Sequence, residues 1–381
     1  MAYFDNAATT FPKPAMVYEF MDEFYRKCGA NSGRGNYKLA QGASSLIAET
    51  RSLIKEVLHC PTKQVIFTPS ATIALNIILQ GLIKKGLKRV YISPFEHNAV
   101  TRTLHYFEIV EGIQVYQLAV SDDLKYDMER IKYQFDDNRP DLVVVSHASN
   151  VIGLVAPIEH IFSLAKEYGA FTVADMSQTA GLVDCNIGLV TFDFAVFAGH
   201  KTLYGPTGLS GFVMNPEIEL PSILFGGTGT ESANPNMPND LPEKFEMGTL
   251  NISGIAGLNA ALKWNLDVGI EEIAMKEKYN RSKLLSILEG FDWLKVVGNV
   301  PSNQYVGIVS CVIRGISSDS TSVIFSEQGI AVRTGLHCAP LAHKFLNTFP
   351  AGTVRFSVGY HTSDDDFEEL ETALDYIEGE L

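Results

Sequence analysis

A lysine and an aspartate follow two short apolar runs that have the composition of buried β-strands. Lys201 comes shortly after residues 194–198, and Asp175 ends the run 171–175. A lysine amine can bond covalently to a carbonyl group, and a carboxylate can keep a ring nitrogen protonated. Each residue alone is explained more simply, as a solvated lysine or a turn-forming aspartate. Lys201 and Asp175 can act in one reaction only if the fold brings them together.

Polar residues also follow three other strand-like runs of this region. His97 follows residues 89–93, and Asn150 follows residues 142–147. A helix start rich in small and hydroxyl residues follows residues 64–68, and its free N–H groups would favour a phosphate. The further candidates for a shared site are Ala71, Thr72, His97, Asn150, Gln178 and His200.

Pyridoxal phosphate needs this combination of groups. It requires a lysine for a Schiff base, an acid beside its pyridine nitrogen and an anion site for its phosphate. Neither GxxxxGK[ST] nor a strand followed by GxGxxG occurs, so the usual nucleotide signatures do not compete. The sequence therefore predicts pyridoxal phosphate, and no metal, at this site. The other candidates could stack on the ring (His97), donate to its hydroxyl (Gln178) or reach its phosphate (Thr72 and His200).

A mostly parallel sheet is needed to position these residues. From about residue 64 to 215, seven runs rich in Val, Ile and Phe alternate with stretches of helical spacing. This pattern is typical of an α/β fold whose sheet is covered by helices on both faces. Ligands bind at the carboxyl ends of the strands in such sheets. The segment 221–250, rich in Gly, Pro, Asn and Thr, is predicted to be a long functional loop or hairpin.

The last third of the chain predicts a smaller α+β domain. A long helical segment is expected from about 254 to 290. Strands are expected at 306–313 and 354–359, and helices near 319–328 and 364–378.

Composition limits the partners of the protein. The 381 residues carry a net charge of -14, which disfavours nucleic acid. No apolar run approaches the roughly 18 residues of a membrane span, and the first residues do not resemble a secretory signal. The five cysteines are odd in number and widely scattered, which favours reduced thiols that mostly fill the core. We therefore expect a cytoplasmic protein that binds neither nucleic acid nor membrane.

Cys338 stands in the stretch AVRTGLHCAP, residues 331–340, whose glycine and proline indicate a loop. Three interpretations remain open at this point. Burial is the default for a cysteine. A metal site of His337, Cys338 and His343 would lack a fourth ligand at the usual spacing. A nucleophile would need a thiol pKa that is lowered by nearby Arg333 and His337.

Over nearly its whole length the chain resembles the class V aminotransferase family, in the branch of cysteine desulfurases and selenocysteine lyases. The resemblance rests on an ordered set of motifs: YFDNAATT, ATIALN, EHNAV, SHASNVIG, VADMSQTAG, GHKTLYGPTG, FEMGTLNISG, VRTGLHCAP and VRFSVGYH. It implies the fold-type I architecture of pyridoxal phosphate enzymes, with a large domain of residues 16–255. Residues 1–15 and 256–381 would form the small domain. It also implies a homodimer with shared active sites.

The resemblance assigns roles to individual residues. Lys201 matches the Schiff-base lysine, Asp175 the partner of the pyridine nitrogen, and Cys338 the cysteine that carries a persulfide. Ala71 and Ala198 stand where relatives place hydroxyl residues, which leaves fewer donors for the phosphate. The remaining matches are the ring-stacking His97, the ring-hydroxyl donor Gln178, the phosphate contacts Thr72 and His200, Thr249 from the neighbouring subunit, and the substrate-binding Asn150, Arg355 and Arg333.

The implied reaction moves sulfur from cysteine to Cys338 and releases alanine. The persulfide would then pass to an acceptor, expected to be a protein, and the short segment between Cys338 and Arg355 resembles the compact-loop (second) group of desulfurases. Two alternatives remain: a selenocysteine lyase, and an aminotransferase or other lyase in which Cys338 is not essential. Arg355 itself is compatible with carboxylate binding or with an ordinary surface position.

Overall fold

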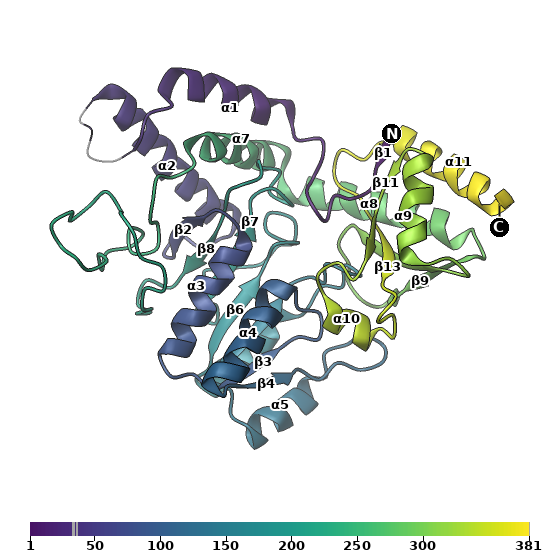
Figure 1. The fold of residues 1–381 in the computed structure, drawn as a ribbon, viewed down its shortest axis with the longest axis horizontal. Helices are drawn as coiled ribbons and strands as arrows, with labels where there is room; N and C mark the ends of the chain where they lie inside the picture. Colours follow the sequence, from purple (N-terminus) through teal and green to yellow (C-terminus); the bar gives the residue numbers. More distant parts are fainter. Residues whose placement is uncertain (33–34, 36, 381) are drawn as a thin grey trace.

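A seven-stranded sheet forms the centre of the larger part of the computed structural model, which describes residues 1–32, 35 and 37–380 (Figure 1). The strand order is β2-β8-β7-β6-β5-β3-β4. β8 runs antiparallel to β2 and β7, and the other neighbouring strands are parallel, so the predicted mostly parallel sheet is confirmed. The strands are β2 (Gln64–Thr68), β3 (Arg89–Ile92), β4 (Gln114–Gln117), β5 (Leu142–Ser146), β6 (Phe171–Asp175), β7 (Phe194–Ala198) and β8 (Ser210–Met214).

Alternate residues of the central strands bury their side chains on opposite faces of this sheet. On β5, Val143 and Val145 join one apolar cluster, whereas Leu142 and Val144 join the other. The first cluster is completed by α2 (Lys38–Val57), α5 (Met128–Asp137), α6 (Ile158–Glu167) and α7 (Ile252–Val268). The second is completed by α3 (Ala71–Lys84) and α4 (Asn98–Glu111), and α1 (Ala15–Cys28) packs on α7. Helices thus cover both faces, which explains why the strands are apolar throughout.

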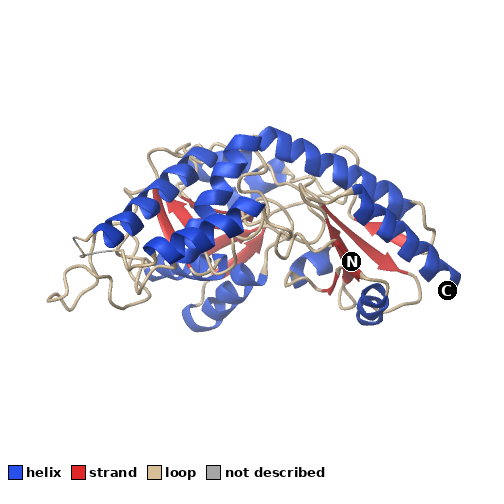
Figure 2. Ribbon diagram, turned by 90° about the horizontal axis from the view of Figure 1, so that it is seen from above, coloured by secondary structure: helices blue, strands red, loops and turns tan. Residues whose placement is uncertain are grey.

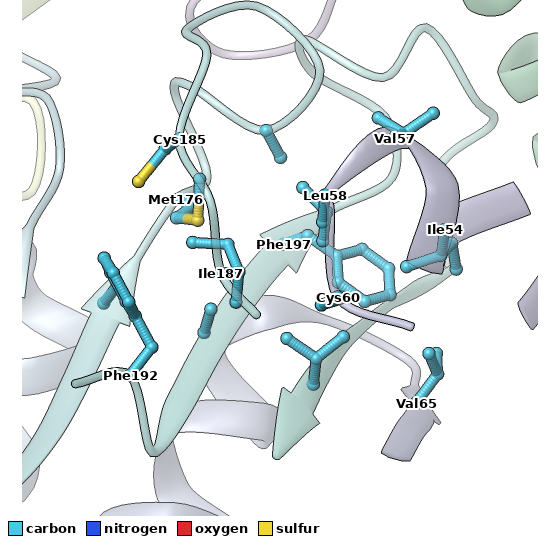
Figure 3. Close-up of a cluster of buried hydrophobic side chains, with 14 of the residues drawn as sticks. Ile54, Val57, Leu58, Cys60, Val65, Met176, Cys185, Ile187, Phe192 and Phe197 are labelled. Atoms are coloured by element: carbon cyan, nitrogen blue, oxygen red, sulfur yellow. The ribbon is translucent and has the colours of Figure 1, made fainter. Parts of the chain in front are cut away.

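Two cysteines lie in the part of the first cluster that Figure 3 shows. Cys60 and Cys185 lie there among aliphatic and aromatic side chains, and the thiol of Cys185 also donates to Glu159 Oε1 at 3.7 Å. Burial raises the pKa of each thiol to about 12. Cys311 is also buried, in the core of the smaller sheet. The prediction that most of the cysteines fill cores is confirmed.

A smaller antiparallel sheet lies beside the larger one (Figure 2). Its order is β12-β13-β10-β9, and the N-terminal strand β1 pairs with β11 next to it. These strands are β1 (Ala2–Tyr3), β9 (Leu294–Val297), β10 (Ile308–Ile313), β11 (Ile330–Ala331), β12 (Arg333–Gly335) and β13 (Thr353–Ser357). The accompanying helices are α8 (Ile270–Glu289), α9 (Ser318–Glu327), α10 (Pro340–Phe345) and α11 (Asp364–Glu380). The boundary between the two domains stays a prediction.

The structure corrects two details of the predicted elements. The helical segment expected over 254–290 is two helices, because Gly269 takes a φ of 92° and ends α7 before α8 begins. The segment 221–250 forms no helix or strand among the described residues, so the hairpin alternative is wrong and the loop is right. This loop projects from the larger part of the molecule, next to α2, in Figure 1. No helix among the described residues is long and apolar enough to cross a membrane.

Candidate active site

A cavity of about 200 Å³ lies where the parallel strands end. Its walls come from the start of α3 and from the turns that follow β3, β5, β6 and β7. The common edge of the parallel strands therefore gathers the residues that the sequence placed after each strand. The predicted residues among its lining are Ala71, Thr72, His97, Asn150, Asp175, Gln178, His200 and Lys201, together with Ala198.

Asp175 is held rigidly at the end of β6. Its Oδ1 accepts hydrogen bonds from the backbone N–H and the hydroxyl of Ser177, at 3.0 and 2.6 Å. Both donors approach the same oxygen, and among the described residues Oδ2 has no hydrogen-bond donor. A buried carboxylate with one oxygen fixed and one free suits a protonated ring nitrogen.

Lys201 lines the same cavity, after β7. Desolvation lowers the pKa of its amine to about 8, while the charge of Asp175 acts in the opposite direction. Arg355 and Arg333 lower it further. A neutral amine is thus accessible near pH 7, as covalent bonding to a carbonyl group and proton removal both require.

Two histidines face this cavity as neutral rings. Burial lowers the pKa of His97 and of His200 to about 4. His97 caps α4, since its Nδ1 accepts the N–H of Ala99 at 3.0 Å. The Nδ1 of His200 is buried and has no hydrogen-bond partner among the described residues. This orphaned atom, next to the free N–H groups at the start of α3, fits a phosphate group.

Glu96 is a residue that the sequence reasoning missed, although it begins the motif EHNAV. It is fully buried, and it accepts hydrogen bonds from the Ser93 hydroxyl and from the N–H and hydroxyl of Ser146. It thereby joins the ends of β3 and β5, one residue before His97. Desolvation raises the pKa of Glu96 to about 7, and the nearby charge of Asp175 adds to this effect. The motif was visible, but nothing in it showed that its glutamate would be buried.

Arg355 is buried on β13, so the surface alternative is wrong. Its side chain is 1% exposed. Nη2 donates to Asp5 Oδ1 at 2.9 Å and Nη1 to the carbonyl of Asn150 at 2.8 Å. Its Nε is buried without a partner among the described residues. Asp5 is a second residue that the sequence reasoning missed, because 350 residues separate it from its partner.

The loop that carries Cys338 is strained and anchored on two sides. His337 and Cys338 have φ angles of 46° and 56°, a region that residues other than glycine rarely adopt. The carbonyl of His337 accepts from Asn150 Nδ2 at 2.7 Å, and the carbonyl of Cys338 accepts from the N–H of Asn98 at 2.7 Å. The thiol itself is half-buried. These contacts hold the loop against the rim of the cavity.

Arg333 supplies the positive charge beside this thiol. Its Nη2 lies 3.7 Å from Cys338 Sγ. The expectation that His337 also contributes a positive charge is wrong. Burial, with repulsion from Arg355, lowers the pKa of His337 to about 2, and its Nε2 is paired with the Thr353 hydroxyl. His343, the third member of the metal alternative, is paired with the Thr348 hydroxyl.

Four predicted residues do not line this cavity. Arg355 lies buried behind Asn150, and Arg333 and Cys338 open onto a neighbouring groove. Thr249 is exposed and lies on the long loop. Its predicted contact with the phosphate stays a prediction.

Comparison with known proteins identifies the family and the fold of this chain. The family model "Aminotransferase class-V" matches residues 2–370. A probable cysteine desulfurase of Pyrococcus abyssi is 32% identical over 99% of this chain and 93% of its own length. The solved apo structure of a cysteine desulfurase from Thermococcus onnurineus superposes with a TM-score of 0.91 at 28% identity, over 100% of this chain and 95% of that one.

The chain belongs to the class V aminotransferase family, as its motifs indicated. Among its relatives, the protein of Haloferax volcanii that is 29% identical over 98% of this chain is named a cysteine desulfurase. The fold expected from the resemblance is confirmed.

Proposed function

We propose that this protein is a pyridoxal phosphate-dependent L-cysteine desulfurase. The observation that carries the proposal is the placement of Cys338, whose strained loop is tied to the cavity through Asn150 and whose sulfur lies beside Arg333. An aminotransferase would have no use for a thiol in this position. The names of the relatives support the same activity.

The cavity has the groups that would hold the cofactor. Among the described residues, Asp175 Oδ2 has no donor and could accept from the ring nitrogen, and His200 Nδ1 has no partner and could contact the phosphate with the start of α3. His97 lines the same cavity and could stack on the ring. Gln178 also lines the cavity, although its Nε2 donates to the carbonyl of Ala7. When bound, pyridoxal phosphate supplies a carbonyl group that bonds to amines and a ring that draws electrons away from the substrate Cα.

The remaining residues position the substrate and receive its sulfur. The Nε of Arg355, which has no partner among the described residues, would donate to the substrate carboxylate, and Asn150 links Arg355 to the Cys338 loop. The neutral amine of Lys201 can take the proton from Cα. Cys338 Sγ attacks the substrate sulfur: its S–H is replaced by an S–S bond, and the C–S bond of the substrate breaks. In sum, cysteine and the Cys338 thiol give alanine and a persulfide on Cys338.

Two copies of the chain would form the working enzyme. Thr249 is exposed and lies outside the cavity of its own chain, so a neighbouring copy would supply it. We place the enzyme in the cytoplasm, where Cys338 would stay reduced; all five cysteines are unpaired.

The decisive experiment compares L-cysteine with L-selenocysteine, in the wild type and in Cys338→Ser. A desulfurase loses alanine formation from cysteine by at least about 100-fold in the variant, because the sulfur has no acceptor. If cysteine turnover survives in the variant while its cofactor absorbance is normal, the proposal is wrong. Survival of selenocysteine turnover alone would show that the same site also acts as a lyase.

A further inference from the structure

A second cavity opens on the far side of the Cys338 loop, and the reaction proposed above does not use it. This outer groove has a volume of about 800 Å³, against about 200 Å³ for the cofactor cavity. It runs between one face of α4 and the segment from β12 to α10, which Figure 1 shows side by side. Cys338 lines this groove and is not among the described residues that line the cofactor cavity.

The Cys338 loop therefore forms a partition between the two spaces. On the inner side, Asn150, which lines the cofactor cavity, donates to the carbonyl of His337. On the outer side, Asn98, which lines the groove, donates to the carbonyl of Cys338. A group on Cys338 can consequently be approached through the groove.

The outer groove is positively charged in a protein that is otherwise acidic. Arg102, Arg333 and Lys344 line it, and Glu108 carries the one carboxylate among the described residues that line it. Glu108 Oε2 itself lies 3.4 Å from His105 Nδ1. The whole chain, by contrast, has a net charge of -14. This local excess of positive charge would attract an anion and repel a cation.

We propose that the outer groove binds the sulfur acceptor, and that this acceptor is a small thiol bearing carboxylate groups, in place of the protein acceptor expected from the sequence. The inference rests on the proposed desulfurase activity. At about 800 Å³, the groove has room for a molecule of this size. The acceptor thiolate attacks the outer sulfur of the Cys338 persulfide, the S–S bond to Cys338 breaks, and Cys338 leaves as a thiolate. The acceptor becomes a persulfide, and no external oxidant or reductant is needed.

The test uses three thiols of different charge: mercaptosuccinate (anionic), 2-mercaptoethanol (neutral) and cysteamine (cationic). Alanine release from saturating L-cysteine is measured against the concentration of each thiol, with the thiol-free rate subtracted. The cofactor-loaded wild type is compared with R102E/K344E. The matched control is R130E/K132E, which makes the same change in net charge on α5, at exposed residues that do not line the groove. Dividing variant by wild type for each thiol removes the intrinsic reactivity of that thiol.

R102E/K344E should lower kcat/KM for mercaptosuccinate roughly tenfold, change that for 2-mercaptoethanol by less than about twofold and raise that for cysteamine. The control variant should match the wild type with all three thiols. Equal effects on the three thiols, or the same effects in the control variant, would overturn the inference and leave the desulfurase proposal standing. If the wild type forms no alanine from cysteine with any thiol, the proposed function and the inference fail together. Thermal melting of each variant checks that it is folded.

Discussion

Burial has opposite consequences in the cofactor cavity and in the hydrophobic cluster of Figure 3, which contains Cys60 and Cys185. Desolvation is the main cause in both places, since it disfavours the charged form of any group. In the cavity it lowers the pKa of Lys201 to about 8 and makes a neutral, reactive amine accessible. In the cluster it raises the pKa of Cys60 to about 12 and keeps the thiol protonated and inert. The same physical effect thus prepares one residue for chemistry and removes another from it.

Cys338 differs from the buried Cys60 and Cys185 in its exposure and in the charge beside its sulfur. It is half-buried, and a guanidinium lies 3.7 Å from its sulfur. Lys63 gives the matching contrast with Lys201. Lys63 is buried close to Cys60, and its amine donates to the carbonyl of Phe192 at 2.6 Å. Position relative to the cavity, and not residue type, separates the functional lysine and cysteine from the structural ones.

The largest effect is expected from replacing Lys201, with Lys63 replaced separately for comparison. Lys201→Ala should reduce alanine formation by about 10³-fold or more, because it removes both the covalent anchor and the base. Lys63→Met should keep turnover and lose only stability. Steady-state assays with both variants measure this difference. Similar losses in both would mean that Lys201 is a structural residue.

The pH dependence of cofactor binding tests the lowered pKa of Lys201. A neutral amine is needed to bond to the carbonyl group, and its fraction rises with pH through about 8. The rate at which apoprotein binds pyridoxal phosphate should therefore rise about tenfold from pH 7 to 9 and then level off. Stopped-flow absorbance follows the reaction. A rise that continues undiminished beyond pH 9 would indicate a lysine of ordinary pKa.

Removing the positive charge beside Cys338 should make its thiol less reactive, and so closer in reactivity to the buried thiols of Cys60 and Cys185. In Arg333→Met, alkylation of Cys338 by iodoacetamide at pH 7 should slow by roughly threefold to tenfold, because the thiolate loses its nearest positive charge. Peptide mass spectrometry gives the rate for each cysteine. Unchanged labelling of Cys338 would show that Arg333 has no effect on the thiol.

The smallest effect on activity is expected from a substitution inside the hydrophobic cluster of Figure 3. Cys60→Ser should leave turnover within about twofold of the wild type, yet it buries a hydroxyl among apolar side chains and should cost about 1–3 kcal/mol of unfolding free energy. Urea denaturation measures the loss. A large drop in turnover without destabilisation would contradict the division between the two regions.

The parts of the fold and site that depend on local sequence could be predicted. β5, β6 and β7 are recognisable in the sequence as continuous apolar runs, because both faces of each strand are buried. The parallel sheet then brings Asp175 and Lys201 to one edge. The break at Gly269 could not be predicted with the same ease. Helical spacing continues on both sides of it, and a glycine inside a helix costs only about 1 kcal/mol.

Contacts between distant segments could not be predicted from the sequence. The pairing of Asp5 with Arg355 joins the two ends of the chain, and no local pattern encodes it. The buried network of Glu96 depends on Ser146, 50 residues away. His337 is neutral because it is buried, and the glycine and proline around it in the sequence indicate an exposed loop instead.

A single-turnover experiment with mass spectrometry tests the central claim most directly. The cofactor-loaded enzyme is mixed with one equivalent of L-cysteine and no acceptor thiol, and alanine and the five cysteine-containing peptides are measured together. We predict one alanine per active site and a gain of one sulfur atom on the peptide of Cys338, with no gain at Cys60, Cys185 or Cys311. Alanine formed without sulfur on Cys338 would contradict the account.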